Sequence, residues 1–273
     1  MNNKKTYVIS GATSGIGKAL LEKLSGDNII FAGYRNEEKK ADLTRFSDNI
    51  YPFYIDYSKP ETIKNAIEYI KSKSNKIDTL INIAGCVIAG PLENINIDEI
   101  RRQFNVNVFS HIEMAQGLAN LLNNGKIINI SSMASFGIFP FISPYCTSKR
   151  CLDMFFNSFL IENKRNIKVI SIKPGVISTP LWRKSIDENS KDNKLKTGYE
   201  KEMEYILKNA EENEKTGLSV NEVVKVIIKA DTAKKPKLSY TVGKDAFFAS
   251  LISKLPQNII NKLIKFGIKL RMK

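Results

Sequence analysis

Short apolar runs alternate along the chain with longer segments of helical period. The runs are rich in Ile, Val and Tyr and lack a strict polar alternation, which is typical of strands that are buried on both faces. They predict strands at Tyr7–Ser10, Ile29–Gly33, Tyr51–Ile55, Thr79–Ala84, Lys126–Ser131, Lys168–Ile172 and Leu238–Val242.

The segments between these runs have the apolar spacing of amphipathic helices. They predict helices at roughly Gly15–Ser25, Glu37–Phe46, Glu61–Ser74, Ile97–Leu122, Pro144–Asn163 and Ser219–Ala230. Repeated strand-then-helix units predict a parallel sheet with right-handed crossovers. Such a doubly wound α/β fold binds its ligands beyond the carboxyl ends of the strands.

Two regions depart from this rhythm. The segment from about residue 180 to 216 is polar and charged, with weak helical period near Lys201–Asn209, and it could form a mobile cover over a site. The tail, residues 245–273, is predicted as two short helices separated at Pro256. The second tail helix is basic and amphipathic: it places Ile260, Leu263, Ile264 and Ile268 near one face and Lys262, Lys265 and Lys269 on the other.

Length and charge limit the classes of protein to which the chain could belong. The 273 residues fit one α/β domain over residues 1–273, because no repeat or linker divides them. A net charge of +14 could attract nucleic acid, an anionic membrane or a phosphorylated cofactor. The chain has no zinc-finger spacing, no aromatic RNA-binding motif and no basic low-complexity arm, so we expect a solvated lysine-rich surface and no nucleic-acid partner.

Cysteine and histidine usage gives further limits. The three cysteines have no CxxC spacing, and an odd count fits no closed disulfide framework, so a reducing compartment is expected. No secretory segment and no apolar stretch of ~18 residues is found, which predicts a cytoplasmic protein. His111 is the single histidine, and without a ligand cluster around it we expect a structural role and no metal site.

A glycine-rich loop follows the first predicted strand and precedes the first predicted helix. It carries Gly11, Thr13, Ser14, Gly15, Ile16 and Gly17. Glycines allow the backbone to approach a pyrophosphate, and the helix N-terminus offers free N–H groups to it. The spacing is G-x-x-x-G-x-G, which differs from the common GxGxxG fingerprint, and Ala19 excludes a GxxxxGK[ST] loop. The loop predicts a dinucleotide site.

Two polar residues at strand ends bear on the cofactor. NAD-selective sites usually place an acid after the second strand, whereas this chain has Arg35 there, a planar cation suited to a 2′-phosphate. This favours NADP over NAD, and the alternative is an ordinary surface arginine. Asp56, after the third strand, could accept a hydrogen bond from the adenine amino group, but a turn or capping aspartate remains an equal alternative.

Tyr145 and Lys149 are four positions apart in a helical segment, so they share one face. The lysine ammonium is expected to stabilise phenolate and lower the tyrosine pKa, which would make Tyr145 an acid/base and let Lys149 reach the nicotinamide ribose. Ser132, after the fifth strand, could hold a substrate oxygen. Asn107 could break the helix ladder and hold a water for proton relay. Alone, a Y-x-x-x-K pair is common on surface helices.

Together these motifs resemble the short-chain dehydrogenase/reductase family, over about the whole chain. The loop matches with Ser10 in place of the usual Thr, and the family's Asn-Asn-Ala-Gly motif becomes Asn82-Ile83-Ala84-Gly85. Asn107, Ser132, Tyr145 and Lys149 match its catalytic residues. The resemblance implies that the cofactor contacts Asn82, Ala84 and Gly85, and that Ile177 and Thr179 contact the carboxamide of the nicotinamide.

The resemblance also implies a Rossmann-type seven-stranded parallel sheet in the order 3-2-1-4-5-6-7, helices on both faces, and a homodimer or homotetramer. It implies that hydride passes between NADP(H) and a secondary alcohol or ketone, with Tyr145 as proton donor. In relatives the helix that bears the tyrosine often builds the subunit interface. Its apolar residues fit an interface or a plain core equally: Leu152, Phe155, Phe156 and Phe159.

The substrate is expected to be bulky and hydrophobic. Phe136, Phe139, Phe141 and Trp182 predict an apolar pocket. The general layout is similar to the 17β-hydroxysteroid-dehydrogenase-like branch, so a steroid or bile acid is expected, with a retinoid or lipid ketone as alternative. A non-catalytic NADP-binding regulator is a second hypothesis. A third is peripheral membrane binding through the tail, against which we favour packing on the chain itself or on a neighbouring subunit, because the charged face lacks aromatic anchors.

Overall fold

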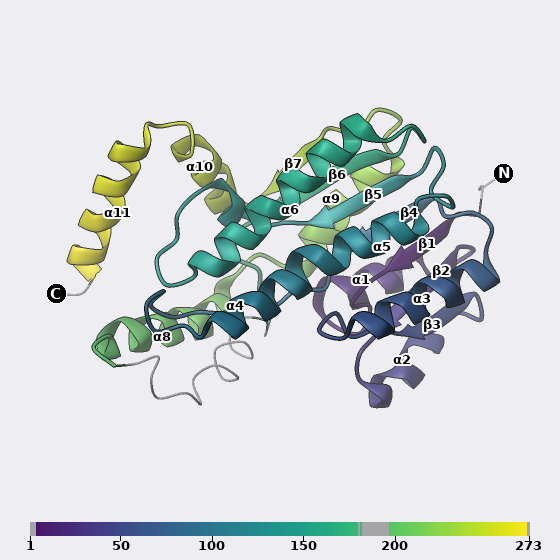
Figure 1. Cartoon of the computed structure of the whole chain (residues 1–273), viewed down its shortest axis with the longest axis horizontal. Coiled ribbons are helices and arrows are strands. Elements are labelled where there is room, and N and C mark those ends of the chain that lie inside the picture. Colours follow the sequence, from purple (N-terminus) through teal and green to yellow (C-terminus); the bar gives the residue numbers. More distant parts are fainter. Residues whose placement is uncertain (1–3, 180, 182–196, 272–273) are drawn as a thin grey trace.

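The computed structural model describes residues 4–179, 181 and 197–271. Its centre is a seven-stranded parallel sheet in the order β3-β2-β1-β4-β5-β6-β7, as the sequence predicts (Figure 1). The strands are β1 (Thr6–Ile9), β2 (Ile29–Tyr34), β3 (Ile50–Tyr54), β4 (Thr79–Asn82), β5 (Lys126–Ile130), β6 (Lys168–Pro174) and β7 (Ser239–Val242).

Helices cover both faces of the sheet. On one face α1 (Gly15–Leu24) packs beside α9 (Val220–Thr232), and on the other α3 (Pro60–Lys73) packs beside α5 (Ser110–Leu118). Neighbouring residues of β1 serve opposite layers, because Val8 joins the core under α3 and α5 while Ile9 joins the core under α1 and α9. Burial on both faces explains why the strands lack polar alternation.

The predicted elements are found with small shifts at their ends. The remaining helices are α2 (Lys40–Thr44), α4 (Ile97–Phe104), α6 (Ser143–Glu162), α8 (Glu200–Thr216), α10 (Lys244–Ile252) and α11 (Gln257–Arg271). Side chains cap the first turn of two helices. Asn96 accepts from the Asp98 N–H at the start of α4, and Ser219 accepts from the Asn221 N–H at the start of α9. The predicted helix Ile97–Leu122 is interrupted by a π-helical turn, Asn105–Phe109, between α4 and α5.

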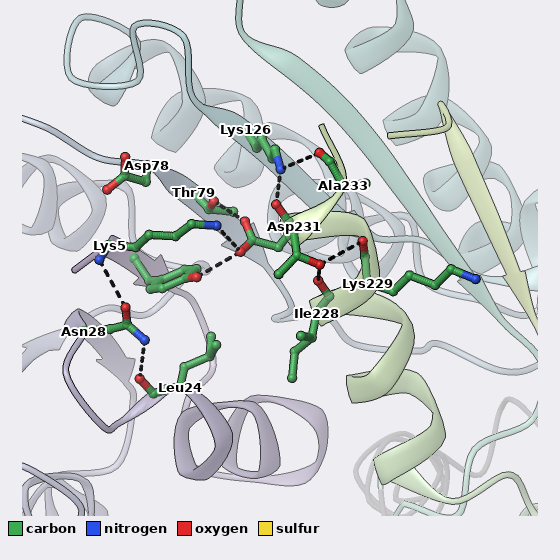
Figure 2. Close-up of polar contacts among 12 residues, drawn as sticks. Lys5, Leu24, Asn28, Asp78, Thr79, Lys126, Ile228, Lys229, Asp231 and Ala233 are labelled. Atoms are coloured by element: carbon green, nitrogen blue, oxygen red, sulfur yellow. Dashed lines mark hydrogen bonds and ion pairs between the residues drawn. The ribbon is translucent and has the colours of Figure 1, made fainter. Parts of the chain in front are cut away.

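A buried carboxylate ties the end of α9 to the amino ends of the strands (Figure 2). Asp231 accepts from Lys5 Nζ at 2.8 Å, from the Tyr7 hydroxyl at 2.9 Å and from Thr79 Oγ1 at 2.6 Å. Lys126 donates to the backbone carbonyls of Asp231 and Ala233. This cluster lies at the edge opposite the strand ends that carry the predicted site, so it serves the fold.

The tail extends from the sheet as α10 and α11, with Pro256 between them, as the sequence predicts (Figure 1). Among the described residues, no helix has both the length and the apolar character needed to cross a membrane. Of the segment that the sequence predicts as a cover, α8 is described, whereas Trp182 and the rest of residues 182–196 lie outside the described part of the chain.

Candidate active site

The glycine-rich loop forms a shallow cradle at the carboxyl end of β1. Gly11 and Gly15 have φ of +68° and +50°, which an L side chain rarely adopts. A Cβ on Gly17 would lie 2.1 Å from the Gly11 carbonyl oxygen, so only glycine lets α1 start this close to the loop. The open face of this loop lines a cavity of about 780 Å³ that extends along the carboxyl edge of the sheet. The cradle therefore fits a dinucleotide phosphate.

Ser10 ties this loop to the next strand. Its hydroxyl accepts from the backbone N–H groups of Ile83, at 2.9 Å, and Ala84, at 3.3 Å. Ser10 thus binds backbone groups of the altered Asn-Ile-Ala-Gly motif. Sequence reasoning noted Ser10 only as a replacement for threonine, because a hydroxyl in a loop gives no signal of its partner.

The cavity beyond β2 is cationic. Arg35 and Lys39 both line it, four positions apart, together with Asn36. None of the ion pairs among the described residues includes Arg35, so its guanidinium remains available to a ligand. Lys39 was not predicted; a second cation four positions after Arg35, at the start of the next helix, is the signal that could have found it.

Asp56 forms a turn after β3 and lies at the cavity surface. Its carboxylate accepts from the Ser58 N–H at 3.0 Å and from the Ser58 hydroxyl at 2.7 Å, which is a turn-forming pattern. The residue also lines the cavity, beside Tyr57 and Ser58. The turn role is observed, and the adenine contact stays a prediction.

Three predicted catalytic side chains meet in the same cavity, beyond the end of β5. Ser132 follows β5, and its hydroxyl is hydrogen-bonded to that of Tyr145 in the first turn of α6. Lys149, one turn later, places its Nζ 5.9 Å from the centre of the tyrosine ring. The Lys149 ammonium donates to the Ile130 carbonyl at 2.8 Å. The four-residue spacing therefore brings both side chains to one face, as predicted.

The expected effect of Lys149 on the tyrosine pKa is wrong for the free protein. Burial raises the pKa of Tyr145 to about 12, and the hydrogen bond from Ser132 offsets only part of that rise. Desolvation is the largest cause because the phenol lies almost wholly out of water, and the Lys149 ammonium is not among the causes of the shift. Tyr145 is thus held as a protonated phenol, which is the form of a proton donor.

Burial acts on Lys149 in the opposite sense, and lowers its pKa to about 8. The carboxylate of Asp153, one turn further along α6, partly offsets this by favouring the charged ammonium. Asp153 is itself held by Lys173 Nζ at 2.7 Å and by the Ser171 hydroxyl at 2.9 Å. The lysine therefore titrates close to neutral pH.

Asn107 lies inside the π-helical turn, so the predicted break in the helix ladder is present. Its side chain accepts from the Cys86 N–H at 2.9 Å and donates to the Cys86 carbonyl and to Ser148 Oγ. A Cβ on Gly85 would lie 3.3 Å from Asn107 Oδ1 and 3.6 Å from Lys149 Nζ. Both atoms thus lie beside Gly85, on the side where glycine has no Cβ, and π-turns are frequent at functional sites.

Most of the predicted cofactor residues line the cavity, with two exceptions. Gly17 and Asn82 are buried, Gly17 below the loop and Asn82 in a hydrogen bond to Asn129 at 2.8 Å. Asn107 is also buried and lies behind the cavity wall rather than in it. The others reach the cavity surface: Gly11, Thr13, Ser14, Gly15, Ile16, Arg35, Asp56, Ala84, Gly85, Tyr145, Lys149, Ile177 and Thr179.

An apolar arm of the cavity adjoins Tyr145. Phe139 and Phe141 line it as predicted, together with Tyr205 and Ile206 of α8 and Ile268 of α11. Phe136 does not line it, because its ring packs under Lys173 Nζ at 4.6 Å, so that prediction is wrong. The helices α8 and α11 come from far along the chain, and only their packing places them here.

His111 is part of the packed layer. It is buried, its Nε2 is 2.9 Å from the Ala84 carbonyl oxygen, and its ring meets Tyr57 edge to face. Burial lowers its pKa to about 3, so the ring is neutral. Within the described part of the chain, no group of three His, Cys, Asp or Glu residues could hold a metal ion.

The family assignment comes from comparison with known proteins. The family model described as short chain dehydrogenase matches residues 5–190. The chain belongs to this family. It is therefore an oxidoreductase of the short-chain dehydrogenase type.

Two relatives cover almost the whole chain. An NADPH-dependent 3-dehydrocapnine reductase of Ornithobacterium rhinotracheale is 30% identical over 96% of each chain. A 3-ketodihydrosphingosine reductase of Bacteroides thetaiotaomicron is 27% identical over 97% of this chain and 98% of its own. The fold matches a short-chain dehydrogenase structure from Streptomyces avermitilis, with a TM-score of 0.77, 19% identity, and 99% and 98% of the two chains covered.

Proposed function

We propose that this short-chain dehydrogenase is an NADPH-dependent reductase that converts the ketone of a lipid-like, apolar substrate into a secondary alcohol. The observation that carries the proposal is one continuous cavity. It joins a glycine cradle, the Ser132–Tyr145–Lys149 group and an apolar arm. A cofactor and a hydrophobic ketone can therefore meet beside a buried phenol.

The cofactor is NADP(H). Arg35 and Lys39 line the cavity beyond β2, where NAD-selective sites usually carry an acid. A 2′-phosphate is a dianionic group that pairs well with a guanidinium and an ammonium. The relative from O. rhinotracheale, which is similar over the whole chain, is named as NADPH-dependent.

The side chains around Tyr145 suit carbonyl reduction. The bound cofactor supplies the hydride. Ser132 and Tyr145 donate hydrogen bonds to the substrate oxygen, which stabilises the negative charge that develops there. Tyr145 then releases its proton to that oxygen, and its raised pKa keeps it protonated until that moment.

Lys149 and Asn107 would help to restore the proton that Tyr145 has given to the substrate. Lys149 has a pKa of about 8, so its ammonium can pass a proton towards the phenolate at neutral pH. Asn107 Oδ1 and this ammonium both lie beside Gly85, 3.3 Å and 3.6 Å from the position that a Cβ would take there, which suits a water between them. Asn107 is also held by both backbone groups of Cys86, so we assign it a positioning role in that route.

The apolar arm favours a lipid ketone over a steroid. Its lining residues come from three separate segments, and Ile268 places one end of the arm beside the tail helix. The relative from B. thetaiotaomicron is named for a ketone of dihydrosphingosine, a lipid. Neither of the two relatives described above is named for a steroid or bile acid.

The test is substrate-dependent oxidation of NADPH, followed at 340 nm, with a long-chain 3-ketolipid, a short methyl ketone and a steroid ketone. We expect the long-chain ketone to have the highest kcat/KM, and NADH to be a poor substitute. A steroid that is turned over as well as the lipid would contradict the substrate assignment.

A substitution of Tyr145 tests the proposed reaction mechanism. Tyr145→Phe should lower kcat by roughly 10²–10⁴-fold, because it removes the proton donor and one hydrogen bond to the oxygen. NADPH affinity, measured by fluorescence titration, should change little, since the glycine cradle is intact. Wild-type turnover in this variant would exclude the proposed mechanism.

A further inference from the structure

The two tail helices expose large apolar side chains to water. On α10 and the turn after it these are Phe247, Phe248, Leu251, Ile252 and Leu255; on α11 they are Ile259, Leu263 and Phe266. Phe248 is 61% exposed and Phe266 is 62% exposed. A monomer rarely leaves so many large apolar groups together in water, so this surface, which we call the tail surface, points to a partner.

The second tail helix has three distinct sides. Ile260 is buried and Ile264 and Ile268 are partly buried, so this side faces the body of the protein. With about 100° of rotation per residue, Ile259, Leu263 and Phe266 form a second, outward side. Lys262, Lys265 and Lys269 form a third side along the flank of the apolar one. The sequence pattern alone had grouped Leu263 with the buried residues.

We propose that the tail surface docks on an anionic lipid membrane. Residues 244–269 carry five lysines and one acid, Asp245. That carboxylate is turned towards the protein, where it accepts from the Val176 N–H at 2.7 Å. The outward surface is therefore apolar at its centre and cationic at its flank, which is the pattern of a helix lying in a membrane interface.

The exposed phenylalanines answer the argument against a membrane, which was the lack of aromatic anchors. The sequence showed no aromatic anchor on the charged face, but Phe247 and Phe248 of α10 and Phe266 of α11 are all exposed to water and can serve as aromatic anchors. A second copy of the chain fits less well, because a two-fold contact of α11 with itself would bring like-charged lysines together without an acidic partner.

The tail surface also adjoins the cavity. Ile268 lines the apolar arm from its inner side, while Phe266, two residues earlier, is exposed. A hydrophobic molecule that leaves a membrane under α11 would therefore be close to the arm. Docking in itself does not depend on the proposed reaction, so the two can fail separately.

The test is flotation of the full chain with vesicles of phosphatidylcholine alone or mixed with phosphatidylglycerol. We expect binding to the mixed vesicles that weakens as salt is raised, and little binding to pure phosphatidylcholine. Replacing Lys262, Lys265 and Lys269 with Gln should weaken binding by roughly 100-fold. Replacing Phe247, Phe248 and Phe266 with Ser should weaken it by at least about tenfold.

Matched controls separate the surface from general charge and hydrophobicity. Lys64, Lys71 and Lys73 on α3 are exposed, and their change to Gln removes the same charge elsewhere. Leu92→Ser and Ile161→Ser remove exposed apolar groups elsewhere. Both controls should bind like the wild type, and all variants should keep wild-type NADPH oxidation with a short soluble ketone.

Two results would overturn the proposal. One is a full-length protein that stays unbound with anionic vesicles at low salt. The other is a phenylalanine variant whose particle mass, measured by light scattering, falls while its vesicle binding stays at the wild-type level, because the tail surface would then be a contact between copies of the chain.

Discussion

Tyr145 is a phenol whose protonation is decided by burial. Its pKa of about 12 keeps it protonated at every pH at which the protein is studied, whereas Lys149, with a pKa of about 8, changes charge within that range. The group that responds to pH in the free protein is therefore the lysine. This follows because burial disfavours the charged form of each group. It raises the pKa of a phenol, which becomes negative, and lowers the pKa of an amine, which becomes positive.

The first prediction concerns the pH dependence of ketone reduction. Lys149 is positively charged below its pKa of about 8 and neutral above it. We expect kcat/KM with NADPH to fall as the pH rises through about 8, because the ammonium that resupplies Tyr145 is lost. Stopped-flow or steady-state rates between pH 6 and pH 10 measure this, and a profile that is flat across that interval would contradict it.

The second prediction concerns cofactor choice. Arg35→Ala with Lys39→Ala removes both cations that line the cavity beyond β2. The KM for NADPH should rise by roughly 10- to 100-fold, since each charge-assisted contact contributes about 1.5–3 kcal/mol at most, while the KM for NADH should change little. Lys40→Ala, next to Lys39 but outside the cavity lining, is the control and should leave both values unchanged.

At the scale of elements, α6 carries Tyr145 and Lys149, the proposed catalytic pair, and also the carboxylate that shifts the pKa of the lysine. Asp153 follows Lys149 by four positions, and its carboxylate raises the lysine pKa against the effect of burial. The same carboxylate pairs with Lys173 of β6, so one side chain links the helix to the strand beside it.

The third prediction tests this link. Asp153→Asn removes the negative charge but keeps the size of the side chain, so the pKa of Lys149 should fall below about 8. The alkaline limb of the kcat/KM profile should move to lower pH. Asp98→Asn, which removes an exposed carboxylate on α4, should leave the limb in place. An unmoved limb in Asp153→Asn would show that Asp153 is only structural.

The fourth prediction concerns the end of α9. Hydrogen bonds from Lys5, Tyr7 and Thr79 lower the pKa of Asp231 below its usual value of 3.8, although burial acts against them. A lowered pKa in the folded state stabilises the protein above the unfolded pKa, and this stabilisation is lost as the pH falls through the folded value. Asp231→Asn should therefore reduce the free energy of unfolding by about 2 kcal/mol at pH 7.

The measurement is urea unfolding, followed by circular dichroism, at pH 7 and pH 3.5. The difference between wild type and Asp231→Asn should shrink at the lower pH, because the carboxylate of the unfolded wild type begins to take up a proton below its usual pKa of 3.8, while the folded protein holds it ionised. Asp27→Asn, an exposed aspartate after α1, should unfold like the wild type at both pH values. A constant difference would mean that the charge contributes nothing.

At the scale of the whole molecule, the apolar residues of α6 divide into two groups. Leu152 and Phe156 are fully buried in the core, and Phe159 packs on Phe156. Met154 and Phe155 are at least half exposed. The two interpretations that the sequence left open, a plain core and a subunit interface, thus apply to different residues of one helix.

The fifth prediction follows from that exposed group. We expect a homodimer or homotetramer, with a particle mass of two or four times 30.8 kDa in light scattering. Met154→Glu with Phe155→Glu should lower that mass, since charges in an apolar contact are costly. Lys64→Glu, on the exposed side of α3, should not. A wild-type protein of 30.8 kDa at micromolar concentration would contradict this prediction.

Much of the fold and site could be predicted because the signals are local. Apolar runs predicted every strand, and the spacing of Tyr145 and Lys149 within one helix placed them on one face, as observed. Phe136 was misplaced because the direction of an aromatic ring in a loop depends on its neighbour, here Lys173 of a distant strand. Ser10 and Lys39 were missed because their partners or positions depend on the packing of other segments.

The sequence by itself determined the parallel sheet, the glycine cradle and the shared helix face of Tyr145 and Lys149, because each depends on periodicity or spacing over a few residues. Only the tertiary structure decided the protonation of Tyr145, the lining of the apolar arm and which side of α11 faces water. These depend on how far water is excluded and on which distant segments meet. Both are properties of packing between segments, and no short stretch of sequence encodes them.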